Sequence, residues 1–178
     1  MTPLVSQLWP QFMADPDFAA SFGRVIVEHA RMLRQERQVV FTLRSAAPLD
    51  KGLCARLLAS LQPDYEGFEL KIDNLFGYAA LDEAALRELM EEMKRDGIPI
   101  NGFLDRCRIT ITGQNITVGV CHGTKFLQEM EFERLLADRV AAHTGVRPKV
   151  TLTSAVGEAE QRQMEEKLER KIKSEAKR

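Results

Sequence analysis

The residues best suited to catalysis or metal binding are three histidines and three cysteines, and they are scattered along the chain. They are His29, His122 and His143, with Cys54, Cys107 and Cys121. A structural zinc site needs ligands at short spacings, and the chain has neither a CxxC motif nor a His–His pair at ligand spacing. Cys121 and His122 are neighbours, but adjacent side chains of a strand point to opposite faces, so they do not form a nucleophile–base pair. The sequence therefore predicts no metal site.

The chain also lacks the common motifs for phosphate binding and acid–base catalysis. Neither the phosphate-cradling GxxxxGK nor the dinucleotide-binding GxGxxG occurs. Carboxylates are abundant, but they fall on charged helix faces, where solvated ion pairs are their default role. We therefore predict no active site and no bound cofactor within these 178 residues.

Phosphate binding by arginine is a second kind of chemistry, and residues 24–45 could supply it. Arg31, Arg34 and Arg37 lie close together there, with Glu28 and Glu36 among them. Clustered guanidinium groups can bind single-stranded nucleic acid, with an affinity that falls steeply as salt rises. Arginine at the end of a hairpin is also an ordinary protection of a sheet edge. Both interpretations of this basic hairpin stay open.

Near the N-terminus, the segment LVSQLWPQFM could bind another protein. It contains Trp9, the only tryptophan, with Leu8 and Phe12 beside it. Tryptophan and other large side chains often anchor protein interfaces. The same three side chains could instead cover the core of a sheet, and the sequence does not separate the two roles.

Composition indicates a globular chain without a general affinity for polyanions. With 44% hydrophobic residues, 29% charged residues and a net charge of −1, nucleic-acid or membrane binding would need a local patch. No apolar run approaches the ~20 residues that span a bilayer. The N-terminus lacks the basic leader and apolar core of an export signal, and three widely spaced cysteines suit a reducing compartment. A cytoplasmic location is expected.

Apolar periodicity predicts the elements that position these candidates. Helices are expected at 15–23, 50–61 and 82–97, a hairpin at 107–120, and strands at 68–76 and 147–154. Residues 24–45 could be one helix or two strands with a polar tip. Their valine-rich and threonine-rich ends favour strands, with Val25, Val27 and His29 on one face. After Thr124 the apolar stripe changes face, which predicts a break near Met130.

In chain order, these elements form the same sequence of helices and strands twice. Residues 82–153 run helix, hairpin, one or two helices, strand, and residues 3–73 do the same if 24–45 is a hairpin. We predict an α+β chain of two small modules, 1–78 and 79–154, each a three-stranded sheet with a β-hairpin and helices on one face. The second has the element order of the K-homology fold without its GXXG loop. Residues 155–178 are predicted to be a charged helical linker.

Several segments of this chain are similar to the start of PolC-type DNA polymerase III, the replicative polymerase α subunit of low-GC Gram-positive bacteria. They are LWPQFM, VVFTLRSAAPLD, LCARLLASL, FELKIDNLF and RITITGQNITVGVCHGTKFLQEMEFERLLADRVAAHTG. The resemblance covers essentially the whole chain. It implies a first module similar to the polymerase-contacting domain of the clamp-loader τ subunit and a K-homology-like second module.

In that family the catalytic aspartates of the DNA-directed DNA polymerase and its 3′–5′ exonuclease lie beyond the matching region. The resemblance therefore implies a non-catalytic adaptor within the replisome during DNA replication. Its expected partner is a replisome protein such as τ, together with the rest of the polymerase chain, and any contact with DNA would be indirect. The alternative is a single-strand-binding module that uses the basic hairpin.

Overall fold

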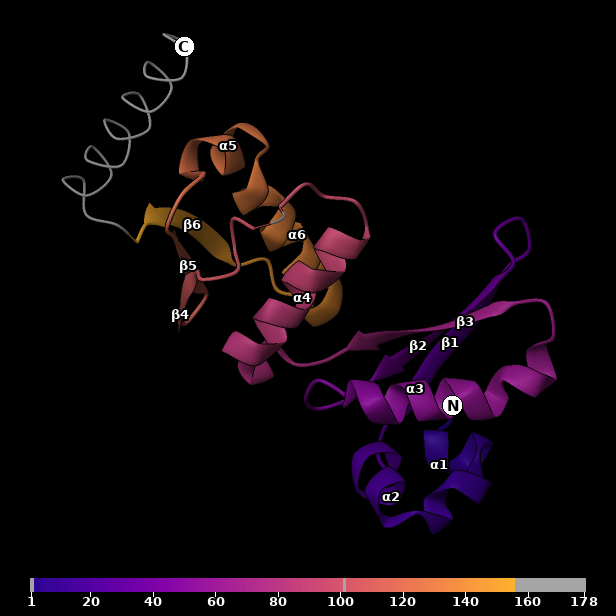
Figure 1. Cartoon of the computed structure of the whole chain (residues 1–178). Helices are drawn as coiled ribbons and strands as arrows, with labels where there is room; N and C mark the ends of the chain where they lie inside the picture. Colours follow the sequence, from indigo (N-terminus) through magenta and orange to yellow (C-terminus); the bar gives the residue numbers. More distant parts are fainter. Residues whose placement is uncertain (1, 101, 156–178) are drawn as a thin grey trace, which may run out of the picture. The chain divides into compact units, whose positions relative to one another are not determined.

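The computed structural model describes residues 2–100 and 102–155, which form two compact units (Figure 1). Unit 1 comprises the described residues of Met1–Ala85 and Ala141–Val146, and unit 2 those of Leu86–Val140 and Arg147–Arg178. Each unit contains one three-stranded sheet and helices, so the chain is α+β. The helical linker predicted for 155–178 lies outside the described residues, apart from Ala155.

Unit 1 opens with short helical segments, and a longer helix follows its first two strands. These are α1 (Val5–Leu8), η1 (Pro10–Ala14), α2 (Pro16–Phe22) and α3 (Lys51–Leu61), followed by the 3-10 turns η2 (Gln62–Tyr65) and η3 (Tyr78–Ala80). Pro10 stops α1 because its nitrogen carries no hydrogen to donate. Asp15 caps α2 by accepting from the Asp17 amide (2.9 Å), and Asp50 caps α3 by accepting from the Leu53 amide (2.8 Å).

Sheet A of unit 1 has the order β1-β2-β3. Its strands are β1 (Ile26–Leu33), β2 (Gln38–Arg44) and β3 (Glu69–Leu75). β1 and β2 are antiparallel and are joined by a turn at 34–37, whereas β2 and β3 run parallel. Residues 24–45 therefore form two strands and not one helix, as their β-branched ends predict.

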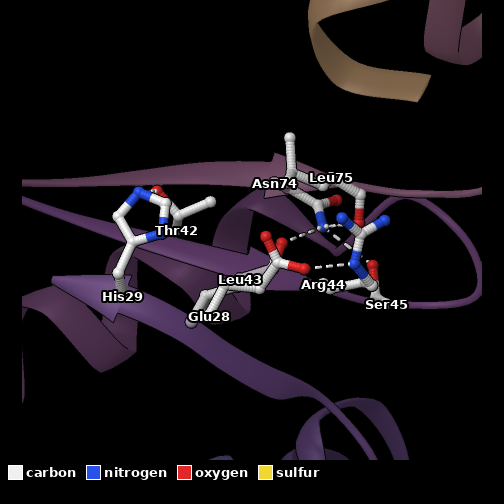
Figure 2. A network of polar contacts seen from close by, with 8 residues as sticks. All are labelled: Glu28, His29, Thr42, Leu43, Arg44, Ser45, Asn74 and Leu75. Atoms are coloured by element: carbon white, nitrogen blue, oxygen red, sulfur yellow. Dashed lines mark hydrogen bonds and ion pairs between the residues drawn. The ribbon is translucent and has the colours of Figure 1, made fainter. Parts of the chain in front are cut away.

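The predicted alternation of faces along β1 is wrong at one point. A β-bulge lies between Val27 and His29, and Glu28 is the extra residue. Val27 pairs with Leu43 on the helix-covered face, but His29 pairs with Thr42 on the opposite face. There the His29 Nε2 and the Thr42 Oγ1 are hydrogen-bonded at 3.0 Å (Figure 2). One inserted residue is enough to move His29 to the other side of the sheet.

The core of unit 1 lies between the helices and one face of sheet A. Val39, Phe41 and Leu43 of the central strand point into it, and Leu57 of α3 and Val5 of α1 pack in the same cluster. All five side chains are almost fully buried. The helices thus cover one face of the sheet, as predicted.

Asn74 fastens the loop after β2 to the end of β3 (Figure 2). Its Nδ2 donates to the Ser45 Oγ (2.7 Å), to the Leu75 carbonyl (3.2 Å) and, at 3.4 Å, to the Leu43 carbonyl. Its Oδ1 accepts from the Leu49 amide (2.9 Å). The half-buried amide therefore uses both its donors and its acceptor within unit 1.

The elements around the second sheet follow the same order as those of the first. They are α4 (Glu83–Arg95), β4 (Arg108–Thr112), β5 (Asn115–Val120), α5 (Thr124–Glu129), α6 (Phe132–Thr144) and β6 (Lys149–Ser154). The amide of Ala85 donates to Asp82, which caps α4, and Gly97 ends the helix at a φ of 88°. Arg139 of α6 donates to Asp96 at 2.5 Å and so ties α6 to the end of α4.

Sheet B repeats the topology of sheet A. β4 and β5 form an antiparallel hairpin, and β6 lies parallel to β5. Ile116 and Val118 of the central strand are fully buried on the helix side, whereas Thr110 and Thr151 on the other face are exposed. The duplicated plan predicted from element order is therefore confirmed at the level of strand order and direction.

The predicted break near Met130 is also confirmed. α5 ends at Glu129 and α6 begins at Phe132. Between them Glu131 takes a positive φ of 56°, a conformation that stops a right-handed helix. The change of direction lets Leu127 of α5 and Phe132 of α6 both become fully buried.

Candidate functional site

The N-terminal surface consists of Leu8, Trp9 and Phe12. Trp9 and Phe12 are half-buried against the core, while Leu8 is 45% exposed. The Trp9 ring lies edge-on to Phe41 of β2, with centroids 5.5 Å apart, and Phe12 stacks on Phe18 at 5.8 Å. The aromatic rings of Trp9 and Phe12 therefore cover the core, whereas Leu8 lies at their solvent edge, where a partner protein could reach it.

Arg56 of α3 holds the helical layer that carries this surface. Its Nη2 donates to Asp15 Oδ2 (2.6 Å), and its guanidinium carbon lies 4.9 Å from the centre of the Phe18 ring. The hydrogen bond from Arg56, helped by the one from the Asp17 amide, lowers the pKa of Asp15 below its ordinary value. The N-terminal surface is thus positioned by contacts from a separate helix.

The arginines of the basic hairpin do not form one cationic patch. Arg31 points from the outer face of β1 toward Asp73 of β3, with 4.0 Å between the Nη2 and Oδ2 atoms. Arg34 and Arg37 are exposed at the turn, and within the described residues neither forms an ion pair. Arg31 therefore has a carboxylate partner, whereas Arg34 and Arg37 have none among the described residues.

The outer face of sheet A is balanced in charge. Its cations are Arg31, Arg44 and Lys71, and its anions are Glu28, Glu69 and Asp73. Arg44 pairs with Glu28 (Figure 2), and Lys71 pairs with Glu69 at 3.7 Å. Three cations against three anions leave little net potential for a polyanion to follow. Val40 and Thr42 are buried beneath these side chains.

Histidines and cysteines are spread over the fold. In residues 2–100 and 102–155, no three side chains of the metal-ligating types lie together in a group that could hold an ion. The three cysteines are free thiols, and Cys121 Sγ lies 3.9 Å from the Arg106 carbonyl oxygen. Burial, with a smaller contribution from the nearby Asp50, raises the pKa of Cys54 to about 11. Such a thiol is protonated at neutral pH and is a poor nucleophile.

A hollow of about 420 Å³ lies between α4 and the chain that follows it in unit 2. It is lined by Arg87, Met90, Glu91, Lys94, Ile100, Leu104 and Asp105. Its charged groups are engaged with one another or with the backbone. Lys94 pairs with Glu91 (3.3 Å) and Asp105 (3.7 Å), and Arg87 donates to the Cys107 carbonyl (2.9 Å). This hollow presents no converging set of available polar groups.

Sequence reasoning missed a cluster of three rings in unit 2. Phe103 stacks on Phe126 of α5 with ring centres 5.2 Å apart, and the His122 ring lies 5.6 Å from Phe103. Phe126 had the spacing of a buried residue, yet it is 42% exposed. Gly123 makes the cluster possible, since a Cβ there would lie 2.1 Å from Phe103 Cδ1. The segment HGTKF, residues 122–126, places His122 and Phe126 close together in the sequence and could have indicated two of the three rings. Phe103 is 19 residues away from His122 and joins them only through the fold.

Among known proteins, no family model, no curated protein and no solved structure matches the chain. Among the described helices, none combines the length and apolar character needed to cross a bilayer.

Proposed function

We propose that the chain is a non-catalytic, cytoplasmic adaptor region of a PolC-type replicative DNA polymerase III. Unit 1 then binds another replisome protein, such as the clamp-loader τ subunit, through the N-terminal surface. The observation that carries the proposal is the exposure of Leu8 beside the half-buried rings of Trp9 and Phe12. Large apolar side chains at the edge of a fixed aromatic layer are typical anchors of protein interfaces.

Two further features support this function over direct DNA binding by unit 1. The outer face of sheet A neutralises its own charges, so it offers no continuous path for phosphates. The three side chains of the N-terminal surface are apolar, and burying them in a complex gains free energy that depends weakly on salt. Unit 2 has the element order of a K-homology module but lacks the GXXG loop with which such modules grip nucleotides, so that mode of binding is not expected of it.

The test is a titration of the whole chain with purified τ, followed through Trp9 fluorescence at 50 and 200 mM salt. Trp9 is the only tryptophan of the chain and lies beside Leu8, so docking of τ should change the Trp9 emission. The fluorescence of τ alone is subtracted from the signal. We expect binding that changes less than threefold between the two salt concentrations. Leu8→Asp should weaken it at least tenfold, because it places a charge in a dry contact.

The matched control is Phe126→Ala, which removes a comparably exposed apolar side chain from unit 2. It should leave τ binding unchanged. Binding that survives Leu8→Asp, or no binding at all in either salt, would refute the proposed partner surface.

The second candidate is single-strand binding by the basic hairpin. It is favoured by Arg34 and Arg37, which are exposed and form no ion pair with any residue that the structure describes. In that case oligonucleotide affinity should fall steeply with salt. It should disappear when Arg31, Arg34 and Arg37 are replaced together by glutamine.

A further inference from the structure

The three-ring cluster of unit 2 has the geometry of a stacking platform. Phe103 and Phe126 lie nearly parallel, with an interplanar angle of 28°, and the His122 ring is tilted by 52° to Phe103. Gly123 takes a φ of 78°, and its missing side chain is what lets Phe103 lie against the turn. The cluster is therefore held by the backbone, and yet Phe126 remains 42% exposed.

Exposed cations lie close to these rings in the sequence. Lys125 precedes Phe126 on α5, and Arg108 begins β4. The backbone carbonyl oxygen of Arg106 lies 3.9 Å from the Sγ of Cys121, the residue after β5. Within the described residues none of the three forms an ion pair. The acids nearest to the rings in the sequence are Asp105, which pairs with Lys94 at 3.7 Å, and Glu129 at the end of α5.

We infer that this end of sheet B binds a single-stranded polynucleotide. One base stacks on the exposed part of Phe126, and Arg106 and Lys125 contact the phosphates on either side. Flat aromatic surfaces beside cations are the usual means of binding single strands without reading their sequence. An apolar peptide anchor is usually taken by a recessed pocket instead, whereas stacked rings offer a planar surface. The site shares no residue with the N-terminal surface or with the basic hairpin, which belong to unit 1.

The test is fluorescence anisotropy of fluorescein-labelled 12-mers, dT12 and rU12, with the whole chain at 50 to 200 mM salt. Similar binding of both is expected, because stacking and phosphate contacts do not require the 2′-hydroxyl; a preference of either kind identifies the natural polymer. Phe126→Ala should weaken binding about tenfold. A 12-mer with abasic sites should bind the wild-type chain as weakly as dT12 binds the variant.

The cations are tested by the slope of log affinity against log salt. Replacing Arg106 and Lys125 together by glutamine should reduce that slope by about 1.4, or about 0.7 for each lost phosphate contact. The matched control is the triple hairpin variant Arg31→Gln, Arg34→Gln and Arg37→Gln, which should leave binding unchanged.

Two more variants guard against a loss of folding. Phe126→Tyr should bind like the wild type, and Phe126→Leu, which keeps apolar cover but removes the ring, should bind like Phe126→Ala. The inference is overturned if dT12 and rU12 fail to bind at 50 mM salt, or if the abasic strand binds as well as dT12. Loss of binding in the hairpin variant, or equal competition by polyglutamate, would overturn it as well. Leu8→Asp should leave oligonucleotide binding intact, so failure here and failure of τ binding are distinguishable.

Discussion

At the scale of single residues, the fold decides how reactive the side chains are. Cys54 lies half-buried on α3, and burial raises its pKa to about 11. His29 has the chemistry of a base, but it is hydrogen-bonded to Thr42 on a strand surface. Neither residue belongs to a group of three metal-ligating side chains among the described residues. Their chemistry is that of packed and paired side chains.

The pKa of Cys54 predicts a dependence of stability on pH. Above its ordinary pKa the unfolded chain loses the thiol proton, while the folded chain keeps it up to about pH 11. The unfolded state then binds fewer protons, so the free energy of unfolding should fall as the pH rises from about 9 to 11. Urea unfolding at pH 8 and pH 10 measures this change.

Cys54→Ala is the comparison for this prediction, because alanine cannot ionise. The variant should lose less stability than the wild type between the two pH values. Equal losses would mean that Cys54 ionises as readily in the folded chain as in the unfolded one.

At the scale of elements, Asn74 is the polar group that joins the end of β3 to the connection between β2 and α3. Asn74→Ala would leave the Leu49 amide and the Ser45 hydroxyl without this partner. We expect a loss of about 1–3 kcal/mol in the free energy of unfolding, because half-buried polar groups would be left unsatisfied. Asn115→Ala, at an exposed strand start, should cost less than about 0.5 kcal/mol. Similar losses in the two variants would contradict the role given to Asn74.

The elements also show how far sequence reasoning reaches. The caps at Asp15 and Asp50, the hairpin at 24–45 and the break near Met130 were predictable, because each depends on neighbours within about one helical turn or on a simple period. The bulge at Glu28 was not, because one extra residue in a strand leaves no local mark.

Within the candidate sites, the contacts between distant parts of the chain could not be predicted from the sequence. The pairing of Arg31 with Asp73 requires β1 and β3 to flank the same central strand. The stack of Phe103 on Phe126 requires the loop before β4 to reach α5. Leu8, Trp9 and Phe12 were identified as candidates, but their division between core cover and exposed edge depends on Phe41 and Phe18.

At the scale of the whole molecule, the chain contains two units with one topology and different surfaces. Sheet A has an outer face on which cations and anions pair, whereas the outer face of sheet B carries exposed threonines. Unit 1 presents an apolar edge at Leu8, and unit 2 presents a partly exposed aromatic cluster with exposed cations close to it in the sequence. The same plan can therefore carry two kinds of binding surface, since the strands set the frame and the outward side chains set the chemistry.

The most direct test of the proposed function is amide hydrogen exchange of the whole chain with and without τ. The account predicts slower exchange in residues 4–12 when τ is bound, and unchanged exchange in residues 103–126. Protection confined to unit 2, or no change in residues 4–12 at saturating τ, would contradict it.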